Sequence, residues 1–289
     1  MRSNVERVIL EFLPPYAIGA ALATLAAHTI PGAELTDLRA RSHTRLLWAS
    51  PGVGEPVAVT VRFHDDHVEV ESDATCMAGS ESLVRRWLDL DVDPRVISEH
   101  FRSDPIIGPL ARERAGLRVI GYPSGFEAAV TTVLGQQVSL AACRTFAGRL
   151  VAAFGVPGPR GLTVFPTPER LAAATPELLQ KAVGLTGARS RTLHALALAC
   201  ADGLRLDPDA DHADVRRRLL ALPGIGPWSA DYLAVRALGD RNGFVPGDLV
   251  LRKALGGISS KEADRASVAW SPYRAYALFH LWTATAYVV

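Results

Sequence analysis

The sequence predicts an α+β fold in two parts, a mixed α+β domain over residues 1–105 and an all-helical domain over residues 106–289. Three observations predict it. Residues 57–71 alternate between apolar and polar in the manner of a β-hairpin, whereas the apolar spacing after residue 106 is helical. Charge also segregates, because residues 1–105 carry 10 basic and 16 acidic side chains and the remainder carries 21 and 14. With net charges of −6 and +7, a polyanion would meet the second part.

In the first part, the apolar, small-residue stretch 16–28 predicts a helix and residues 45–49 a short strand. Two alternating segments, 57–63 and 68–71, flank a polar turn at 64–67 and predict a hairpin with one buried face. Residues 82–90 return to helical spacing.

After residue 106 we expect helices and no strands. Each helical segment is bounded by Pro, Gly, Ser or Thr, as helix ends require. The segments are 126–134, 140–154, 168–174, 176–183, 189–201, 215–222, 229–238 and 273–289, with loops at 157–160 and 207–214.

Composition narrows the class of protein. A chain of 289 residues with 48% hydrophobic and 21% charged residues can fold as one large or two ordinary globular domains. The three cysteines, Cys76, Cys143 and Cys200, have neither disulfide-framework nor zinc spacing. The longest apolar run, 17–27, is shorter than the ~20 residues that cross a bilayer. We expect a cytoplasmic protein without membrane contact, associated with the nucleoid if it is bacterial.

The sharpest local motif is the segment from Leu222 to Ala230, between two helical patterns. Gly224 and Gly226 allow a tight turn around Ile225, and the chain then enters a helix N-terminus, where unpaired amides attract a phosphate. Ser229 could add a hydroxyl donor. An ordinary glycine-rich connector between helices has the same pattern.

A second motif places Asp248 after Pro246 and Gly247, at the start of an apolar helical pattern. An aspartate there is commonly a helix N-cap. It could instead be a carboxylate at the mouth of a cleft, facing a developing positive charge or a water. The residues alone leave both interpretations open.

These two motifs, separated by a helix, resemble the signature of the helix-hairpin-helix–GPD superfamily of base-excision DNA glycosylases. Nearly the whole chain is similar to the DNA-3-methyladenine glycosylase II family of the AlkA type, through residues 14–16, 126–127, 134–139, 165–168, 222–232, 244–253 and 273–282. The resemblance implies an N-terminal domain like half of the TATA-binding protein, then two helical subdomains. It also implies that alkylated purines such as 3-methyladenine are flipped out of double-stranded DNA and their N-glycosidic bond hydrolysed.

The resemblance also assigns residues. Asp248 matches the catalytic aspartate, which would stabilise an oxocarbenium-like sugar and orient or deprotonate water. Trp228, Tyr232 and Trp282 match the pocket walls that stack the flipped base, although the same spacing fits helix core. Gln137 matches the residue that wedges into the duplex, where a known relative has leucine; the alternative is that it faces solvent or caps the next helix.

Two departures concern the pocket, because Thr24 and Thr283 match aromatic positions and imply a wider, more polar slot. Phosphate contacts fall on the backbone of Gly224 and Gly226, with Ser229 beside them.

The resemblance implies no required cofactor. In the family the hairpin binds a monovalent cation, Na⁺ or K⁺, through backbone carbonyls, and the matching positions are Leu220, Leu222 and Ile225. No cysteine follows Cys200, so the iron–sulfur cluster of some relatives has no ligands. We expect the chain to act as a monomer on DNA.

Two other functions remain to be weighed. A non-catalytic DNA-binding module would keep the hairpin, but Asp248 and the aromatic set favour catalysis. A bifunctional glycosylase/lyase for oxidised bases would need a lysine where Trp228 stands, so strand cleavage through a Schiff base is not expected. The sequence leaves the lesion range open, and also whether Gln137 inserts into DNA.

Overall fold

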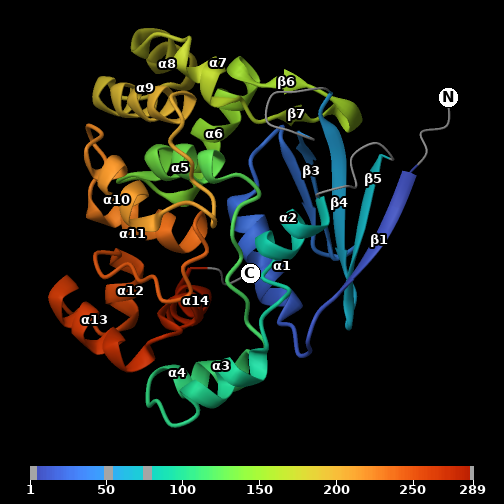
Figure 1. The fold of residues 1–289 in the computed structure, drawn as a ribbon, viewed down its shortest axis with the longest axis vertical. Helices are drawn as coiled ribbons and strands as arrows, with labels where there is room; N and C mark the ends of the chain where they lie inside the picture. Colours follow the sequence, from blue (N-terminus) through green and yellow to red (C-terminus); the bar gives the residue numbers. More distant parts are fainter. Residues whose placement is uncertain (1–4, 49–54, 74–79, 287–289) are drawn as a thin grey trace.

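The N-terminal part is built on a five-stranded antiparallel sheet (Figure 1). The structure is a computed structural model that describes residues 5–48, 55–73 and 80–286. The strand order is β1-β5-β4-β3-β2, with β1 (Val5–Glu11), β2 (Glu34–Asp37), β3 (Ser42–Leu47), β4 (Val57–Phe63) and β5 (His67–Asp73). The predicted hairpin is confirmed as β4–β5. The strand predicted at 45–49 is confirmed over residues 45–47, the end of β3, but residue 48 lies outside the strand and residue 49 outside the described residues.

The sequence patterns did not predict two strands, β1 and β2. β1 contains Ile9, 62% exposed, next to the buried Leu10, so adjacent apolar residues hide the alternation. β2 has only four residues, too few for a period to show.

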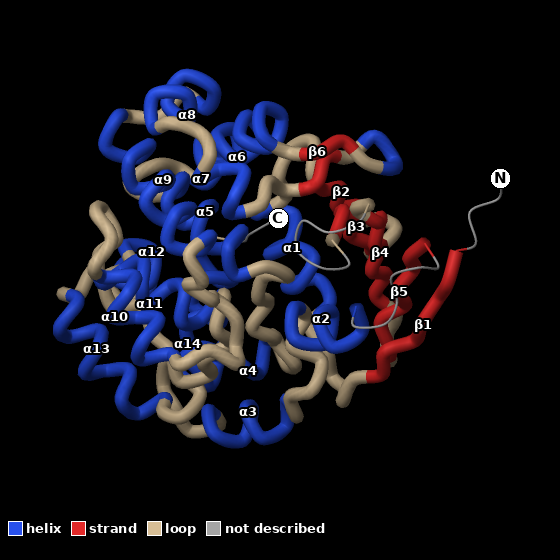
Figure 2. The backbone as a smooth tube through the Cα atoms, turned by 45° about the horizontal axis from the view of Figure 1, so that its top comes forward, coloured by secondary structure: helices blue, strands red, loops and turns tan. Residues whose placement is uncertain are grey.

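Two helices that confirm predicted ones, α1 (Ile18–His28) and α2 (Ser80–Trp87), lie between the sheet and the C-terminal helices (Figures 1 and 2). α3 (Pro94–Phe101) and α4 (Ile107–Glu113) follow at the lower end of the molecule in Figure 1. Asp93 caps α3 by accepting a hydrogen bond from the Arg95 amide at 2.9 Å.

The second part is mainly helical, as predicted. Its helices are α5 (Gly125–Gly135), α6 (Leu140–Phe154), α7 (Pro168–Ala172), α8 (Pro176–Val183), α9 (Gly187–Ala201), α10 (His212–Leu220), α11 (Pro227–Arg236), α12 (Leu249–Ala254), α13 (Ser260–Ser267) and α14 (Arg274–Thr285). The predicted loop at 207–214 is too long, because Asp211 accepts hydrogen bonds from two amides and starts α10 at His212.

The expectation that strands stop at residue 106 is wrong in one place. β6 (Val156–Pro157) and β7 (Thr163–Val164) form a small antiparallel pair around the predicted loop at 157–160. Leu162 packs with Leu46 of the sheet, and Arg160 donates hydrogen bonds to Thr60 Oγ1 and the Glu71 carboxylate at 2.8 and 2.9 Å. Strands of two residues are too short to show a period in the sequence, which is why they were not predicted. Their contacts with the sheet hold them in place.

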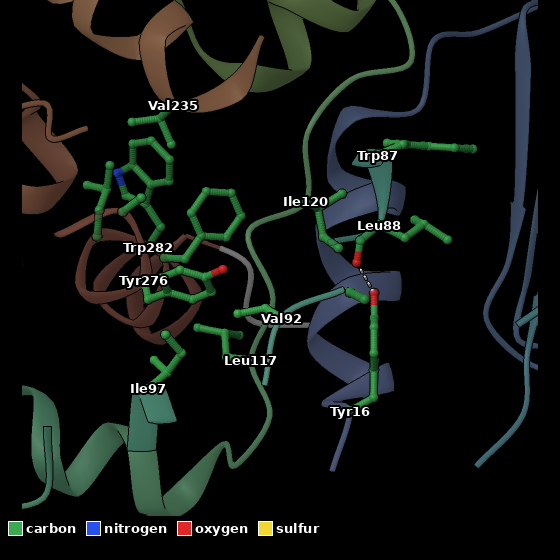
Figure 3. Packing of buried hydrophobic residues seen from close by; sticks show 14 of the residues in the cluster. Tyr16, Trp87, Leu88, Val92, Ile97, Leu117, Ile120, Val235, Tyr276 and Trp282 are labelled. Atoms are coloured by element: carbon green, nitrogen blue, oxygen red, sulfur yellow. Dashed lines mark hydrogen bonds between the residues drawn. The ribbon is translucent and has the colours of Figure 1, made fainter. Parts of the chain in front are cut away.

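Two hydrophobic cores hold the molecule together, and each takes residues from both sides of residue 105. In the first, Tyr16 and Trp87 of the N-terminal part share one core with Val235, Tyr276 and Trp282 of the C-terminal helices (Figure 3). The second core joins α5–α11 and also takes in residues 30 and 33. The domain boundary at residue 105 stays a prediction.

A buried ionic cluster ties the sheet to α5. Arg45 of β3, 5% exposed, donates to the carboxylates of Glu34 and Glu127, which are themselves buried. Burial raises the pKa of both glutamates, and the Arg45 guanidinium between them opposes that rise. Removing Arg45 would leave two buried acids without their counter-charge, so the cluster fixes α5 against the sheet.

Candidate active site

Asp248 lies at the centre of the candidate site and confirms the helix-capping interpretation. It is the N-cap of α12, and its Oδ1 accepts a hydrogen bond from the Leu251 amide at 2.9 Å. The same Oδ1 accepts from the Trp282 indole N–H at 3.1 Å, and Oδ2 accepts from the Trp228 indole N–H at 3.3 Å. The capping bond fixes the orientation of the carboxylate, and the two indoles bring it to the wall of a cavity.

The three predicted wall residues come together as one surface. Trp228 and Tyr232, one turn apart on α11, stack with ring centroids 5.4 Å apart and planes 21° from parallel. Tyr232 and Trp282 follow at 5.7 Å and 44°. Inserting a base between two rings requires about 7 Å, two contacts of ~3.5 Å. A planar aromatic ligand would therefore lie against this wall rather than between its rings.

Trp282 also belongs to the core. Its side chain is 3% exposed and packs at 5.4 Å from the Phe279 ring. Its indole N–H nevertheless reaches Asp248, so the core and site interpretations both hold for this residue.

Asp248 and the aromatic wall line a cavity of about 230 Å³. Sequence reasoning missed several other lining residues, among them His28 of α1, Tyr122 before α5, Thr131 and Thr132 of α5, and Cys143 of α6. No local motif marks them, because α1 and the segment before α5 reach the cavity only through the tertiary fold.

The cavity is close to neutral apart from Asp248, the one acidic side chain among its described lining residues. Burial, with the nearby Arg236, lowers the pKa of His28 to about 3. His28 Nδ1 lies 2.9 Å from the Thr24 carbonyl and so donates to it, which fixes the neutral tautomer. Burial also raises the pKa of Cys143 to about 11. The Asp248 carboxylate thus faces uncharged neighbours.

The two threonines that the resemblance matched to pocket positions lie elsewhere. Thr24 is 2% exposed and donates to the Ala20 carbonyl at 2.9 Å, and Thr283 is 9% exposed. Neither is among the described residues that line the cavity, where His28 and Tyr122 stand.

Gln137 occupies the tip between α5 and α6, as the sequence predicts. It is exposed and has a φ of +56°, in the left-handed region that non-glycine residues rarely adopt. Its side chain can therefore project from the protein without belonging to either helix.

The hairpin of the helix-hairpin-helix motif is the turn between Leu220 and Pro227, which joins α10 to α11. Its two glycines differ. Gly224 has a φ of +77°, and a Cβ there would lie 2.2 Å from Thr192 Oγ1, so the fold itself requires glycine. A Cβ at Gly226, the N-cap of α11, would meet nothing within 4 Å. Gly226 is thus open where a phosphate would approach the helix N-terminus.

The other predicted residues of this motif lie in the turn and in the helix ends on either side of it. Ser229 is only 2% exposed, and its hydroxyl accepts a hydrogen bond from Gln136 at 3.1 Å, so it lies beneath the surface. Leu220 ends α10, Leu222 and Ile225 lie in the turn that follows, and the Leu222 carbonyl accepts from the Ile225 amide at 3.2 Å. That carbonyl keeps a second lone pair for a cation.

Comparisons with known proteins agree with this architecture. The family model for the AlkA N-terminal domain matches residues 7–124, and that for HhH-GPD superfamily base excision DNA repair proteins matches residues 130–267. A solved 3-methyladenine DNA-glycosylase from Archaeoglobus fulgidus has a TM-score of 0.81 over 96% of this chain and 97% of that one, at 21% identity, which shows the same fold.

Two curated relatives place the chain more closely. A probable bifunctional transcriptional activator/DNA repair enzyme AlkA of Mycobacterium tuberculosis (strain H37Rv) is 39% identical over 93% of this chain, which spans 55% of that relative. DNA-3-methyladenine glycosylase 2 of Escherichia coli (strain K12) is 30% identical over 94% of this chain and 95% of its own length. Among the described residues, no helix is long and apolar enough to cross a bilayer. Matched in both of its parts, the chain belongs to the AlkA-type DNA-3-methyladenine glycosylases of the HhH-GPD superfamily.

Proposed function

We propose that this chain is a monofunctional DNA glycosylase that flips 3-methyladenine and related alkylpurines out of double-stranded DNA and hydrolyses their N-glycosidic bond. The observation that carries the proposal is the Asp248 carboxylate, held by two indole N–H groups on an aromatic-walled cavity. The relative from Escherichia coli is named as a DNA-3-methyladenine glycosylase, which supports the proposal.

The chemistry follows from one carboxylate. An alkylated purine is already cationic, so the C1′–N bond breaks with its electron pair leaving on the base, and little acid help is needed. Asp248 then stabilises the positive sugar, and water adds to C1′ and gives its proton to the Asp248 carboxylate, which releases it to solvent. Trp228 and Tyr232 offer π faces that attract a cationic base.

The DNA contacts are assigned to the helical part. The amides at the N-terminus of α11, beside Gly226, would hold a phosphate, and Gln137 would fill the space left by the flipped base. We assign the carbonyls of Leu220, Leu222 and Ile225 to a structural Na⁺ or K⁺ that braces the turn, and the hydrolysis needs no further cofactor. The protein acts as a monomer on double-stranded DNA.

Base release tests the proposal directly. The protein is incubated with a duplex carrying methylated purines and, as a control, with the unmodified duplex, and free bases are separated by chromatography. We expect 3-methyladenine to be released from the methylated duplex alone, leaving uncleaved abasic strands. A covalent adduct trapped by borohydride would instead favour the bifunctional glycosylase/lyase, and binding without any base release would favour the non-catalytic module.

A further inference from the structure

Gln136, the residue before the wedge position, connects the α5–α6 turn to the hairpin. It is the C-cap of α5, and its Nε2 donates to the Gly224 carbonyl at 2.9 Å and to Ser229 Oγ at 3.1 Å. A backbone carbonyl only accepts, so the Gly224 contact fixes which end of the amide is the NH₂. Both of its hydrogens are used across a sequence separation of 88 and 93 residues.

The backbone of Gln136 is held from a third element. Arg189, in the first turn of α9, donates a hydrogen bond to the Gln136 carbonyl, and its guanidinium lies 5.8 Å from the centre of the Phe146 ring. One turn further along α9, Thr192 packs against Gly224 so closely that a Cβ would not fit. Helix α9 therefore braces the α5–α6 turn and the hairpin together.

The next residue needs such a brace. Gln137 holds a left-handed backbone, which persists only where the surroundings over-determine it. The bonds of Gln136 pin the chain directly before it, on both the side-chain and the backbone side.

We propose that Gln136, braced by Arg189, is a positioning residue that sets the distance between the phosphate-anchoring hairpin and the wedge residue Gln137. This inference rests on the proposed glycosylase function. When the hairpin binds a phosphate, Gln137 then lies at a fixed distance from that phosphate along the DNA strand. Phosphate binding therefore places the Gln137 side chain where it can insert between the bases. Displacement of a positioned group by ~1 Å can cost ~100-fold in rate, so the link matters for catalysis.

The test variant is Gln136→Met, which keeps the length of the side chain and removes both donors. Its matched control is Gln180→Met on the exposed surface of α8, outside the site. Single-turnover base release is measured on methylated duplex and on methylated single strands. We expect Gln136→Met to lose about 10-fold on duplex, as for loss of a positioned hydrogen bond, and less than ~2-fold on single strands, which need no wedge.

A combined variant separates positioning from stability. If Gln136 acts through the wedge, Gln136→Met lowers the duplex rate by less than ~2-fold in a Gln137→Ala background, because the wedge is already absent. Thermal melting is followed for every variant, and Gln136→Asn, which keeps an amide one carbon shorter, replaces Gln136→Met if the latter is unfolded at the assay temperature.

Three results would overturn the inference: equal losses on duplex and single strands, fully multiplicative effects in the combined variant, or a duplex rate like that of Gln180→Met. A wild-type protein that releases no base would defeat the proposed function itself. An active wild type with an unaffected Gln136 variant would defeat the link alone.

Discussion

Replacing Asp248 with asparagine removes the charge of the candidate site and keeps its shape. Asparagine caps helices about as well as aspartate, so the Leu251 amide keeps its acceptor. The new NH₂ group then replaces Oδ2 and faces the Trp228 indole donor, while Trp282 keeps its acceptor. Losing a hydrogen bond to a charged acceptor costs about 1.5–3 kcal/mol, which lowers the melting temperature but leaves the protein folded.

The catalytic loss should be larger than the loss of stability. A carboxylate about 4 Å from a developing unit charge contributes ~4 kcal/mol at an effective dielectric constant of ~20. Its removal therefore lowers the rate of bond cleavage roughly 1,000-fold. The affinity for DNA should change little, because we assign the phosphate contacts to the residues between α10 and α11 and not to Asp248.

The assay is single-turnover release of 3-methyladenine at saturating enzyme, beside fluorescence anisotropy for duplex binding and a thermal melt. The expected outcome is a rate down by about three orders of magnitude with binding kept within a few-fold. Asp248→Asn with more than a tenth of the wild-type rate would refute the role of the carboxylate. A matching loss of binding would show that the residue supports the fold or the DNA contact instead.

Three further predictions concern DNA contact and pH. Gly226→Val should weaken duplex binding similarly for all sequences in a salt titration, because its Cβ meets open space where a phosphate would dock and phosphate contacts read no base; unchanged binding would place the phosphate elsewhere. Gln137→Ala should slow base release from duplex about 10-fold and from single strands much less, since only duplex needs the gap filled, and equal losses would mean that Gln137 is no wedge. Burial, with Arg114 nearby, lowers the pKa of His280 from 6.5 to about 3, so the unfolded chain takes up a proton below pH 6.5 that the folded state refuses. The free energy of unfolding then falls as pH falls from 6.5 towards 3, by about 1.4 kcal/mol per pH unit from this residue. Chemical denaturation at several pH values should therefore show a shallower decline in the free energy of unfolding for His280→Leu than for wild type. Parallel profiles for the two proteins would refute the role of His280.

The sequence predicts those parts of the molecule that have a local cause. The β4–β5 hairpin was readable because its alternation is uninterrupted, and α6 because its apolar spacing runs between Ser139 and Gly155. Asp248, Gly224 and Gly226 could be predicted as turn residues because turns restrict the residue type at single positions. The pair β6–β7 was not, since its order comes from contact with the sheet.

The same distinction explains the site. The predicted wall residues sit on α11 and α14, where helical spacing and resemblance both mark them. No sequence motif singles out His28 or Tyr122 as a site residue. Each reaches the cavity from a segment whose sequence pattern predicts only local structure. A cavity made by four or more separate elements is a property of tertiary packing. An element that contributes only one residue to it shows no periodic pattern in the sequence that could predict that residue.

Asp248 shows why the structural and catalytic interpretations of one residue need not compete. A cap requires a single oxygen accepting from a backbone amide, which is all that Ser139 supplies for α6 at 3.2 Å. Asp248 accepts the capping bond and also two indole N–H groups from α11 and α14, which a cap alone does not require. The backbone bond fixes the carboxylate before substrate arrives, so no free energy of substrate binding is spent on orienting it. A carboxylate that caps a helix and also accepts hydrogen bonds from cavity-lining side chains is therefore fixed in orientation before substrate arrives, and on this ground we propose Asp248 as the catalytic group.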